Sequence, residues 1–160
     1  MTDYALRTLW RVDAPIERVY EAIEDAEAWP AWWPGVRRVE RLADGDADGV
    51  GTRYRFEFRS RLPYSLVFDV RVAQVRRPTR LVGEASGELA GIGTWTLQAA
   101  DDGWTDVRYD WNVRTTRWWM NLLAPLTRLA FVRNHDVIME WGRIGLGRRL
   151  GASVESDSPA

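Results

Sequence analysis

Cysteine and lysine are absent from this chain of 160 residues, and histidine occurs only once, as His135. Without cysteine the chain has no disulfide bond, no thiolate nucleophile and no cysteine-ligated metal, a composition typical of a cytoplasmic protein. One histidine without a repeated ligand spacing is a poor basis for a zinc site. We therefore predict no metal and no cofactor.

A strong net charge and a long apolar run are also missing. The formal net charge is -1 and the arginines are spread through the chain, which argues against a nucleic-acid partner. No apolar run approaches the ~18 to 20 residues of a membrane span, and the first residues lack the apolar core of a signal peptide. The sequence therefore predicts no stable membrane insertion.

Alternation of apolar and polar residues predicts that much of the chain is β-structure. The predicted strands cover residues 4–12, 36–42, 53–59, 64–72, 81–87, 93–99 and 107–113. Two short helical pieces, 16–23 and 26–35, follow the first strand. Pro15 suits the first turn of a helix, whereas Pro30 and Pro34 cannot both lie inside one regular helix.

The polar run DGDADG at residues 44–49 predicts a turn between two of these strands. Asp44, Asp46 and Asp48 also match the first half of a calcium-binding loop. Arg55, however, stands where that loop needs its bidentate Glu. We therefore favour a polar hairpin turn over a calcium site.

The segment 117–150 is the only one long and periodic enough for a major helix. A set of residues recurs there at spacings of three and four, which predicts that they share one buried face: Leu123, Thr127, Ala130, Phe131, Asn134, Val137, Ile138, Trp141 and Ile144. Gly142 and Gly145 predict close packing of this helix on the sheet. The small polar residues at 152–160 predict a disordered tail after a single domain at residues 1–151.

The order of these elements predicts the fold class. Consecutive strands followed by a helix, without βαβ alternation, indicate an α+β fold with an antiparallel sheet of about six to seven strands. The sheet would have one apolar face and one charged face. If it curves around the long C-terminal helix, the two apolar faces meet and tend to leave a cavity between them.

Several segments resemble the START-like (SRPBCC, or helix-grip) superfamily. They are VDAPIERVY at 12–20, WPAWWPGV at 29–36, GTWTL at 93–97, the strand at 105–113 and residues 134–142. This superfamily includes polyketide cyclase/dehydrase proteins, lipid-transport proteins and Bet v 1-like proteins. The resemblance implies an apolar pocket for lipids, sterols, polyketides or other hydrophobic ligands, but its motifs specify architecture rather than an activity.

His135 is the one candidate for a catalytic acid or base, because imidazole titrates near neutrality. No second titratable group is evidently aligned with it. We favour the alternative that His135 is satisfied by Asp136 or by a backbone carbonyl. No Ser lies in a nucleophile turn, and the glycines at 142–147 follow the wrong order for a phosphate-binding loop.

Aromatic residues on the inward face of the predicted sheet form the candidate ligand site, because small-molecule pockets are mostly apolar. With the inward face of the helix, the candidate ligand-binding residues are Tyr54, Phe56, Phe58, Tyr64, Phe68, Trp95, Tyr109, Trp111, Phe131, His135 and Ile138. The alternative is that these rings fill the core completely. The sequence leaves both alternatives open.

A second aromatic group lies beside helix ends and loops. It consists of Trp29, Trp32, Trp33, Trp118 and Trp119. We expect these indoles to flank the mouth of the pocket as a lid. The alternatives are an exposed apolar patch for a partner, or loop anchors packed under the sheet.

The leading functional hypothesis is binding or transport of a hydrophobic small molecule by a monomer or a homodimer. The alternative is an enzyme of the polyketide aromatase/cyclase type that acts in the same cavity, with His135, Tyr64 or Tyr109 moving protons. Alternation places the charged strand residues outward, which favours a binding protein over an enzyme. A third alternative is a protein partner docked on the tryptophan-rich rim.

Overall fold

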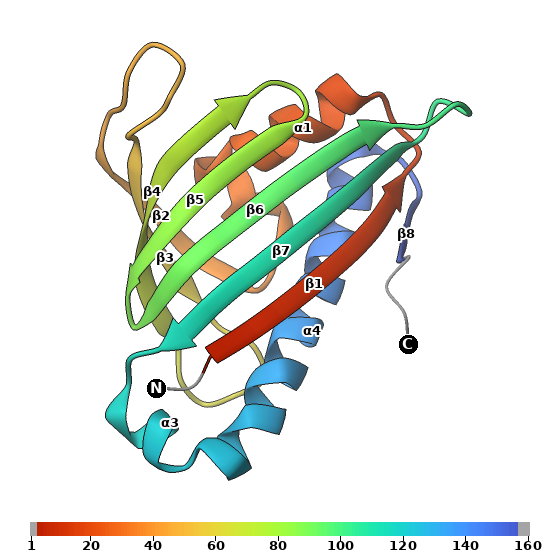
Figure 1. The fold of residues 1–160 in the computed structure, drawn as a ribbon. Helices are drawn as coiled ribbons and strands as arrows, with labels where there is room; N and C mark the ends of the chain where they lie inside the picture. The colour runs from red at the N-terminus through yellow and green to blue at the C-terminus, as the bar shows by residue number, and fades with distance from the viewer. Residues whose placement is uncertain (1–2, 157–160) are drawn as a thin grey trace.

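The computed structural model describes residues 3–156, except for the side chains at positions 124 and 125. One antiparallel sheet, in the order β2-β3-β4-β5-β6-β7-β1-β8, curves around a long C-terminal helix (Figure 1). The elements in chain order are β1 (Asp3–Val12), α1 (Ile16–Glu24), the 3-10 turn η1 (Ala26–Ala28), α2 (Trp29–Trp32), β2 (Val36–Ala43), β3 (Arg53–Phe58), β4 (Leu66–Arg76), β5 (Arg80–Gly87), β6 (Leu89–Ala99), β7 (Thr105–Thr115), α3 (Trp118–Leu122), α4 (Ala124–Leu150) and β8 (Val154–Ser156).

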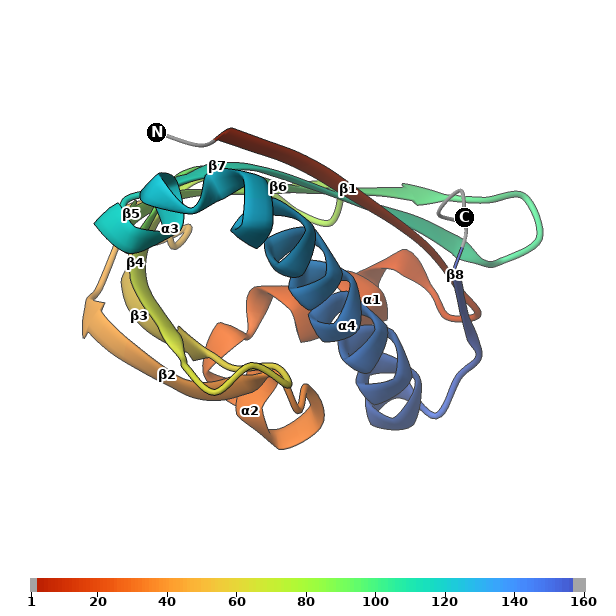
Figure 2. The same ribbon diagram turned by 90° about the horizontal axis from the view of Figure 1, so that it is seen from below.

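The helices lie on the concave side of the sheet. Figure 2 shows α4 crossing that side diagonally, with α1 and α2 beside its C-terminal half. Strand alternation explains which residues face α4: on β7, Val107, Trp111 and Val113 are buried, whereas Arg108 and Arg114 are exposed. The α+β helix-grip fold predicted from the sequence is confirmed.

Within the described residues the sheet has eight strands, where the sequence predicts about six to seven, because β8 pairs with β1. Gly151 ends α4 in the left-handed conformation (φ 63°) and turns the chain back, so that buried Val154 lies opposite Val12. A disordered tail from residue 152 is therefore a wrong prediction for residues 154–156. Three residues are too few to reveal alternation in the sequence. Residues 157–160 lie outside the described part of the chain.

The segment predicted as one helix at 117–150 is two helices, α3 and α4, joined at Leu123. Pro125 has no backbone N–H, so it suits the first turn of a new helix better than the interior of a longer one. The Thr127 hydroxyl donates to the carbonyls of Met120 (3.0 Å) and Leu123 (3.1 Å) and ties the first turn of α4 to α3.

Two glycines set how closely α4 approaches its neighbours. A Cβ on Gly142 would lie 2.6 Å from the ring of Trp33, and a Cβ on Gly145 would lie 1.7 Å from the carbonyl oxygen of Trp32. The close packing predicted for these glycines is confirmed. The predicted partner is wrong, because α4 packs there on α2 and the residue that follows it rather than on the sheet.

The polar turn at residues 44–49 connects β2 to β3 as the predicted hairpin. One carboxylate oxygen of Asp46 accepts hydrogen bonds from the backbone N–H groups of Asp48 (2.9 Å) and Val50 (3.0 Å). Arg55 lies in β3 and pairs with Asp69 on β4 at 2.8 Å. The aspartate-rich pattern is thus accounted for by turn chemistry.

Candidate ligand-binding cavity

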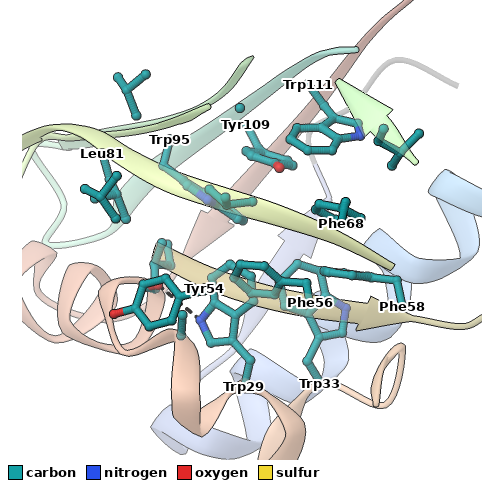
Figure 3. A pocket seen from close by; sticks show the side chains of 18 of the residues that line it. Trp29, Trp33, Tyr54, Phe56, Phe58, Phe68, Leu81, Trp95, Tyr109 and Trp111 are labelled. Atoms are coloured by element: carbon teal, nitrogen blue, oxygen red, sulfur yellow. Dashed lines mark hydrogen bonds between the residues drawn. The ribbon is translucent and has the colours of Figure 1, made fainter. Parts of the chain in front are cut away.

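A cavity of about 170 Å³ lies between the concave face of the sheet and α4. Figure 3 shows its aromatic wall, where side chains of β3, β4, β6 and β7 lie opposite Trp29 and Trp33. The lining runs from Leu66 and Leu89, the first residues of β4 and β6, to Leu81 near the start of β5. The cavity therefore follows the apolar face of the sheet along much of its length.

Ten of the eleven residues predicted for the ligand site line this cavity. They are Tyr54, Phe56, Phe58, Phe68, Trp95, Tyr109, Trp111, Phe131, His135 and Ile138. Alternation along the strands and helical spacing along α4 bring these side chains to one space. That they bind a ligand stays a prediction.

Tyr64 is the exception, and its predicted place in the cavity is wrong. Strand β4 begins at Leu66, so Tyr64 belongs to the preceding loop and not to the inward face of the strand. Its ring meets Trp119 edge-on at 5.4 Å between centroids, and the guanidinium of Arg117 lies 5.5 Å from the ring centre. Tyr64 therefore joins the β3–β4 loop to α3.

Aliphatic residues and glycines also line the cavity, and sequence reasoning based on aromatic rings missed them. They include Ile23, Leu66, Val70, Val72, Val75, Leu81, Gly83, Leu89, Gly93 and Met139. Leu66, Val70 and Val72 could have been found, because they alternate in phase with Phe68 along β4. Ile23 on α1 carries no comparable signal, since only the tertiary fold brings α1 to the sheet.

The rings pack tightly against one another and still leave the cavity. Trp95 and Tyr109 stack at 4.1 Å between centroids, and Phe58 and Phe68 stack at 5.5 Å. Ligand pockets commonly measure about 300–1,000 Å³, whereas a cavity of about 150 Å³ is known to hold one benzene molecule. At about 170 Å³, this cavity matches a ligand with about one ring.

His135 provides an unpaired polar group at the cavity. Its side chain is only 10% exposed, and neither ring nitrogen has a hydrogen-bond partner among the described residues. A carboxylate oxygen of Asp136 lies 3.6 Å from Nδ1, which is too far for a hydrogen bond. The expectation that Asp136 or a backbone carbonyl satisfies this imidazole is therefore wrong. Buried polar groups are rarely left unpaired without a reason.

The Tyr109 hydroxyl is a second polar group of the lining. It forms no hydrogen bond within residues 3–156, and burial raises the pKa of Tyr109, so the phenol stays neutral and can donate. Gly93 makes room beside it, since a Cβ there would lie 3.0 Å from the hydroxyl oxygen and 2.8 Å from the ring of Trp111. Donor groups are thus available in a mostly apolar wall.

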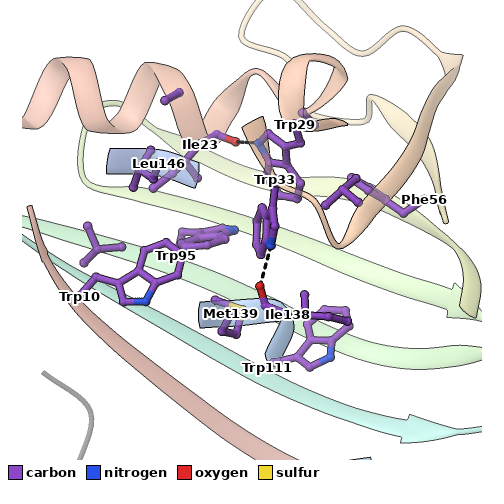
Figure 4. Packing of buried hydrophobic residues seen from close by; sticks show 14 of the residues in the cluster. Trp10, Ile23, Trp29, Trp33, Phe56, Trp95, Trp111, Ile138, Met139 and Leu146 are labelled. Atoms are coloured by element: carbon purple, nitrogen blue, oxygen red, sulfur yellow. Dashed lines mark hydrogen bonds between the residues drawn. The ribbon is translucent and has the colours of Figure 1, made fainter. Parts of the chain in front are cut away.

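Trp29, Trp32 and Trp33 lie in the core and not at a rim, contrary to the expected lid. They are 8%, 8% and 2% exposed, and Figure 4 shows Trp29 and Trp33 packed among the buried residues. The indole of Trp29 donates to the carbonyl of Ile23 (3.1 Å), and that of Trp33 donates to the carbonyl of Ile138 (2.7 Å). These hydrogen bonds allow full burial of the indoles. Trp29 and Trp33 form part of the cavity wall.

Trp118 and Trp119, also predicted for the pocket mouth, begin α3 and do not line the cavity among the described residues. Trp118 is 74% exposed. Trp119 is partly buried against Tyr64, beside an Arg117 that pairs with Glu88 (Nε to Oε1 2.8 Å) and donates to the carbonyl of Ser65 (3.2 Å). Ser65 and Glu88 directly precede β4 and β6, so these contacts tie α3 to the start of both strands. The first residues of these strands, Leu66 and Leu89, line the cavity.

The opposite end of the cavity, at the β2–β3 loop, is more polar. Glu24 and Asp48 line it. Arg77 pairs with Glu24 through Nε (2.9 and 2.8 Å) and donates to the carbonyl of Asp48 (3.0 Å), which holds α1 to this loop. The guanidinium of Arg41 lies 5.6 Å from the ring centre of Tyr54, and burial raises the pKa of Tyr54. At this end the Glu24 carboxylate is therefore matched by the guanidinium of Arg77.

The curved sheet, the long helix and the largely apolar space between them together define a helix-grip fold. A family model described as "Polyketide cyclase / dehydrase and lipid transport" matches residues 8–136. The chain belongs to this family. No curated protein matches the sequence.

Solved structures show the same fold at low sequence identity. The protein TTHA0849 from Thermus thermophilus has a TM-score of 0.73 at 21% identity, over 92% of this chain and 97% of that one. The Zhui aromatase/cyclase from Streptomyces sp. R1128 has a TM-score of 0.62 at 16% identity, over 89% and 95%. A START superfamily protein from Mycobacterium smegmatis has a TM-score of 0.63 at 19% identity, over 83% and 96%.

Proposed function

We propose that the chain binds a small, largely apolar molecule in the cavity between the sheet and α4. The observation that carries the proposal is the unpaired imidazole of His135 in a space lined by stacked rings and aliphatic side chains. Aromatic and aliphatic walls stabilise an apolar ligand through burial, at about 25 cal/mol per Å² before the entropy and desolvation costs of binding.

The polar groups of the lining suggest what the ligand carries. The two ring nitrogens of His135 can donate or accept hydrogen bonds, and the neutral phenol of Tyr109 offers another donor. A ligand with one hydroxyl or carbonyl group could satisfy groups that the protein itself leaves unpaired. We therefore propose a ligand with about one ring and one polar substituent.

Phenol and toluene provide a matched pair of probes, because they differ mainly in the hydroxyl group. Titration calorimetry with the full chain should detect binding of both. In the His135→Leu and Tyr109→Phe variants, phenol affinity should fall by about threefold to tenfold, since one net hydrogen bond is lost, whereas toluene affinity should hold. Binding of neither probe, or equal losses for both, would contradict the proposed recognition.

The stability of the His135→Leu variant gives an independent readout. Removing a buried, unpaired polar group should raise the free energy of unfolding by about 1–2 kcal/mol. The unpaired imidazole carries a desolvation cost in the folded state, and Leu does not. Urea unfolding measures this change. A variant that is more stable but binds phenol less well would show that His135 is kept for a ligand and not for the fold.

A second candidate function is an enzyme of the polyketide cyclase/dehydrase type. The observation that favours it is that His135 and Tyr109, two groups able to move protons, line the same cavity. The name of the family model and the similarity to an aromatase/cyclase are consistent with this candidate.

Native mass spectrometry of the protein purified from its own host, followed by organic extraction, separates the two candidates. A single unchanged ligand at stoichiometric occupancy would favour a binding protein or carrier. A mixture of two related molecules, converted one into the other by the wild type but not by His135→Leu, would favour an enzyme.

A further inference from the structure

An exposed apolar corner, formed by α3 and the first turns of α4, has no role in the cavity. It consists of Trp118, Leu122, Leu123, Leu126 and Leu129, which are 74%, 71%, 45%, 77% and 60% exposed. Figure 1 shows these turns projecting beyond the ends of β1 and β7. Contiguous exposed apolar patches on soluble domains commonly mark interaction sites.

The outward stripe of α4 shows that this apolar corner is not an ordinary solvated helix face. Leu126, Leu129 and Ala130 are exposed at helical spacing, and the same stripe continues with exposed Arg133 and Asp136. The outward face is thus apolar in the first turns of the helix and charged farther along. Solvation alone would favour polar residues along the whole stripe.

The charge around the apolar corner is positive. No Asp or Glu occurs between Asp110 and Asp136 in the sequence. Arg114, Arg128 and Arg133 are exposed and form no ion pair within the described residues.

Neighbouring segments do not cancel the positive charge around the apolar corner. The β3–β4 loop, which Tyr64 and Arg117 hold against α3, adds Arg59 and Arg61 and no acidic residue. Among nearby acidic residues, Asp3 lies opposite Arg114 in the sheet, and Glu88 pairs with Arg117.

We propose that the apolar corner docks on the surface of an anionic lipid bilayer. Trp118 and the leucines would enter the interface between headgroups and acyl chains, and the exposed arginines would contact lipid phosphates. No helix within the described residues is long and apolar enough to cross a membrane, so the contact is peripheral. The proposal does not depend on a ligand in the cavity.

Charge and shape favour a bilayer over a second copy of this chain. A symmetric dimer would place the same patch against itself and would bring like-charged arginines together. The patch also projects from the end of the molecule, whereas a partner helix would need a groove.

Flotation of the full-length protein with lipid vesicles tests this inference without any ligand. The wild type should float with vesicles of phosphatidylcholine containing one third phosphatidylglycerol at low salt, and weakly with phosphatidylcholine alone or at high salt. The double variant Leu126→Gln/Leu129→Gln should lose more than about tenfold in vesicle partitioning, because it removes two of the inserted side chains.

Single variants of α4 provide matched controls and test the contribution of one arginine. Ile144→Gln changes an apolar side chain that is 40% exposed on the same helix and should float like the wild type. Arg133→Gln should weaken flotation by about fivefold, the effect of one charge near an anionic surface, whereas exposed Arg149→Gln should have little effect. Circular dichroism should show equal helix content in all these variants.

Three outcomes would overturn the proposal. The first is a wild type that does not float with anionic vesicles. The second is a Leu126→Gln/Leu129→Gln variant that floats as well as the wild type. The third is a wild-type dimer in sedimentation velocity that the same double variant converts to a monomer, since the apolar corner would then be an interface between copies. Phenol and toluene binding should be unchanged in every case, so the two proposals fail separately.

Discussion

The two halves of α4 have different surroundings. From Gly142 to Leu150 the helix is fixed by contact, with Gly142 and Gly145 packed against Trp33 and Trp32 and with Leu146 fully buried. From Leu126 to Met139 it borders a cavity on one side and, in its first turns, exposes leucines on the other. The comparison suggests that the C-terminal half provides stability and that the N-terminal half is available for binding.

The largest effect should come from adding a methyl group at the tightest contact of the C-terminal half of α4. Gly145→Ala would place a Cβ 1.7 Å from the backbone carbonyl oxygen of Trp32, which cannot move without displacing α2. The free energy of unfolding should fall by more than about 3 kcal/mol, at the upper end of overpacking costs. Urea unfolding measures the loss.

Gly147→Ala is the control in the same helix. Its Cβ would lie 3.0 Å from the Ala152 carbonyl oxygen, and the better helix propensity of Ala offsets part of that contact. The stability of this variant should stay within about 1 kcal/mol of the wild type. Equal losses in both variants would contradict the special role of the contact at Gly145.

A leucine-to-alanine substitution in each half of α4 compares the contribution of the two halves to stability. Leu146 is 0% exposed and Leu126 is 77% exposed. Leu146→Ala should cost about 3 kcal/mol of unfolding free energy through lost burial and a new void, whereas Leu126→Ala should change it by less than about 0.5 kcal/mol. A comparable cost at Leu126 would mean that the exposed leucines stabilise the fold, and the division of α4 into two functional halves would be wrong.

A larger side chain in the cavity should lower ligand affinity, whereas the same change on the outer face of the sheet should not. Val70 lines the cavity, whereas Val67 on the same strand is 38% exposed on the outer face. Val70→Phe should lower toluene affinity by about tenfold, because the added ring occupies ligand space, and Val67→Phe should leave it unchanged. Titration calorimetry provides the affinities, and an undiminished affinity in Val70→Phe would place the probe elsewhere.

The smallest effect is a pH dependence that reports the buried tyrosines. Burial raises the pKa of Tyr109, so in the folded state this group stays protonated after the unfolded chain has begun to ionise. Its contribution to stability is therefore present below about pH 10 and is lost as the pH rises toward the folded pKa, by up to about 1.4 kcal/mol per pH unit.

Urea unfolding at increasing alkaline pH measures this loss. Tyr109→Phe should reduce the slope of stability against pH, because it removes the ionisable group. Tyr64→Phe, whose ring lies in a loop, should reduce it less, although burial raises the pKa of Tyr64 as well. An unchanged slope in Tyr109→Phe would contradict the raised pKa of this residue.

The strand residues of the cavity were predictable because their signal is local. Alternation alone places Phe56, Phe68 and Trp111 on one face, whichever strands become neighbours. The indoles after α1 were misplaced, because their burial depends on backbone carbonyls at Ile23 and Ile138 that only the folded chain brings within hydrogen-bond distance.

The helix shows the same limit. Periodicity predicted Leu123 and Ile144 on the buried face, yet both are exposed, since the inward face is set by the glycines that pack near Trp32 and Trp33. Helical spacing defines which residues share a face, but contact with other elements decides which face turns inward.

By itself, the sequence determined the α+β class, the long C-terminal helix and most of the rings that face it, because these depend on patterns between near neighbours in the chain. Only the tertiary structure decided that the rings leave a cavity of about 170 Å³, that the imidazole of His135 has no hydrogen-bond partner within residues 3–156, and that leucines stand exposed on α3 and α4. Volume, hydrogen-bond satisfaction and exposure are properties of contacts between distant segments, and no local pattern encodes them.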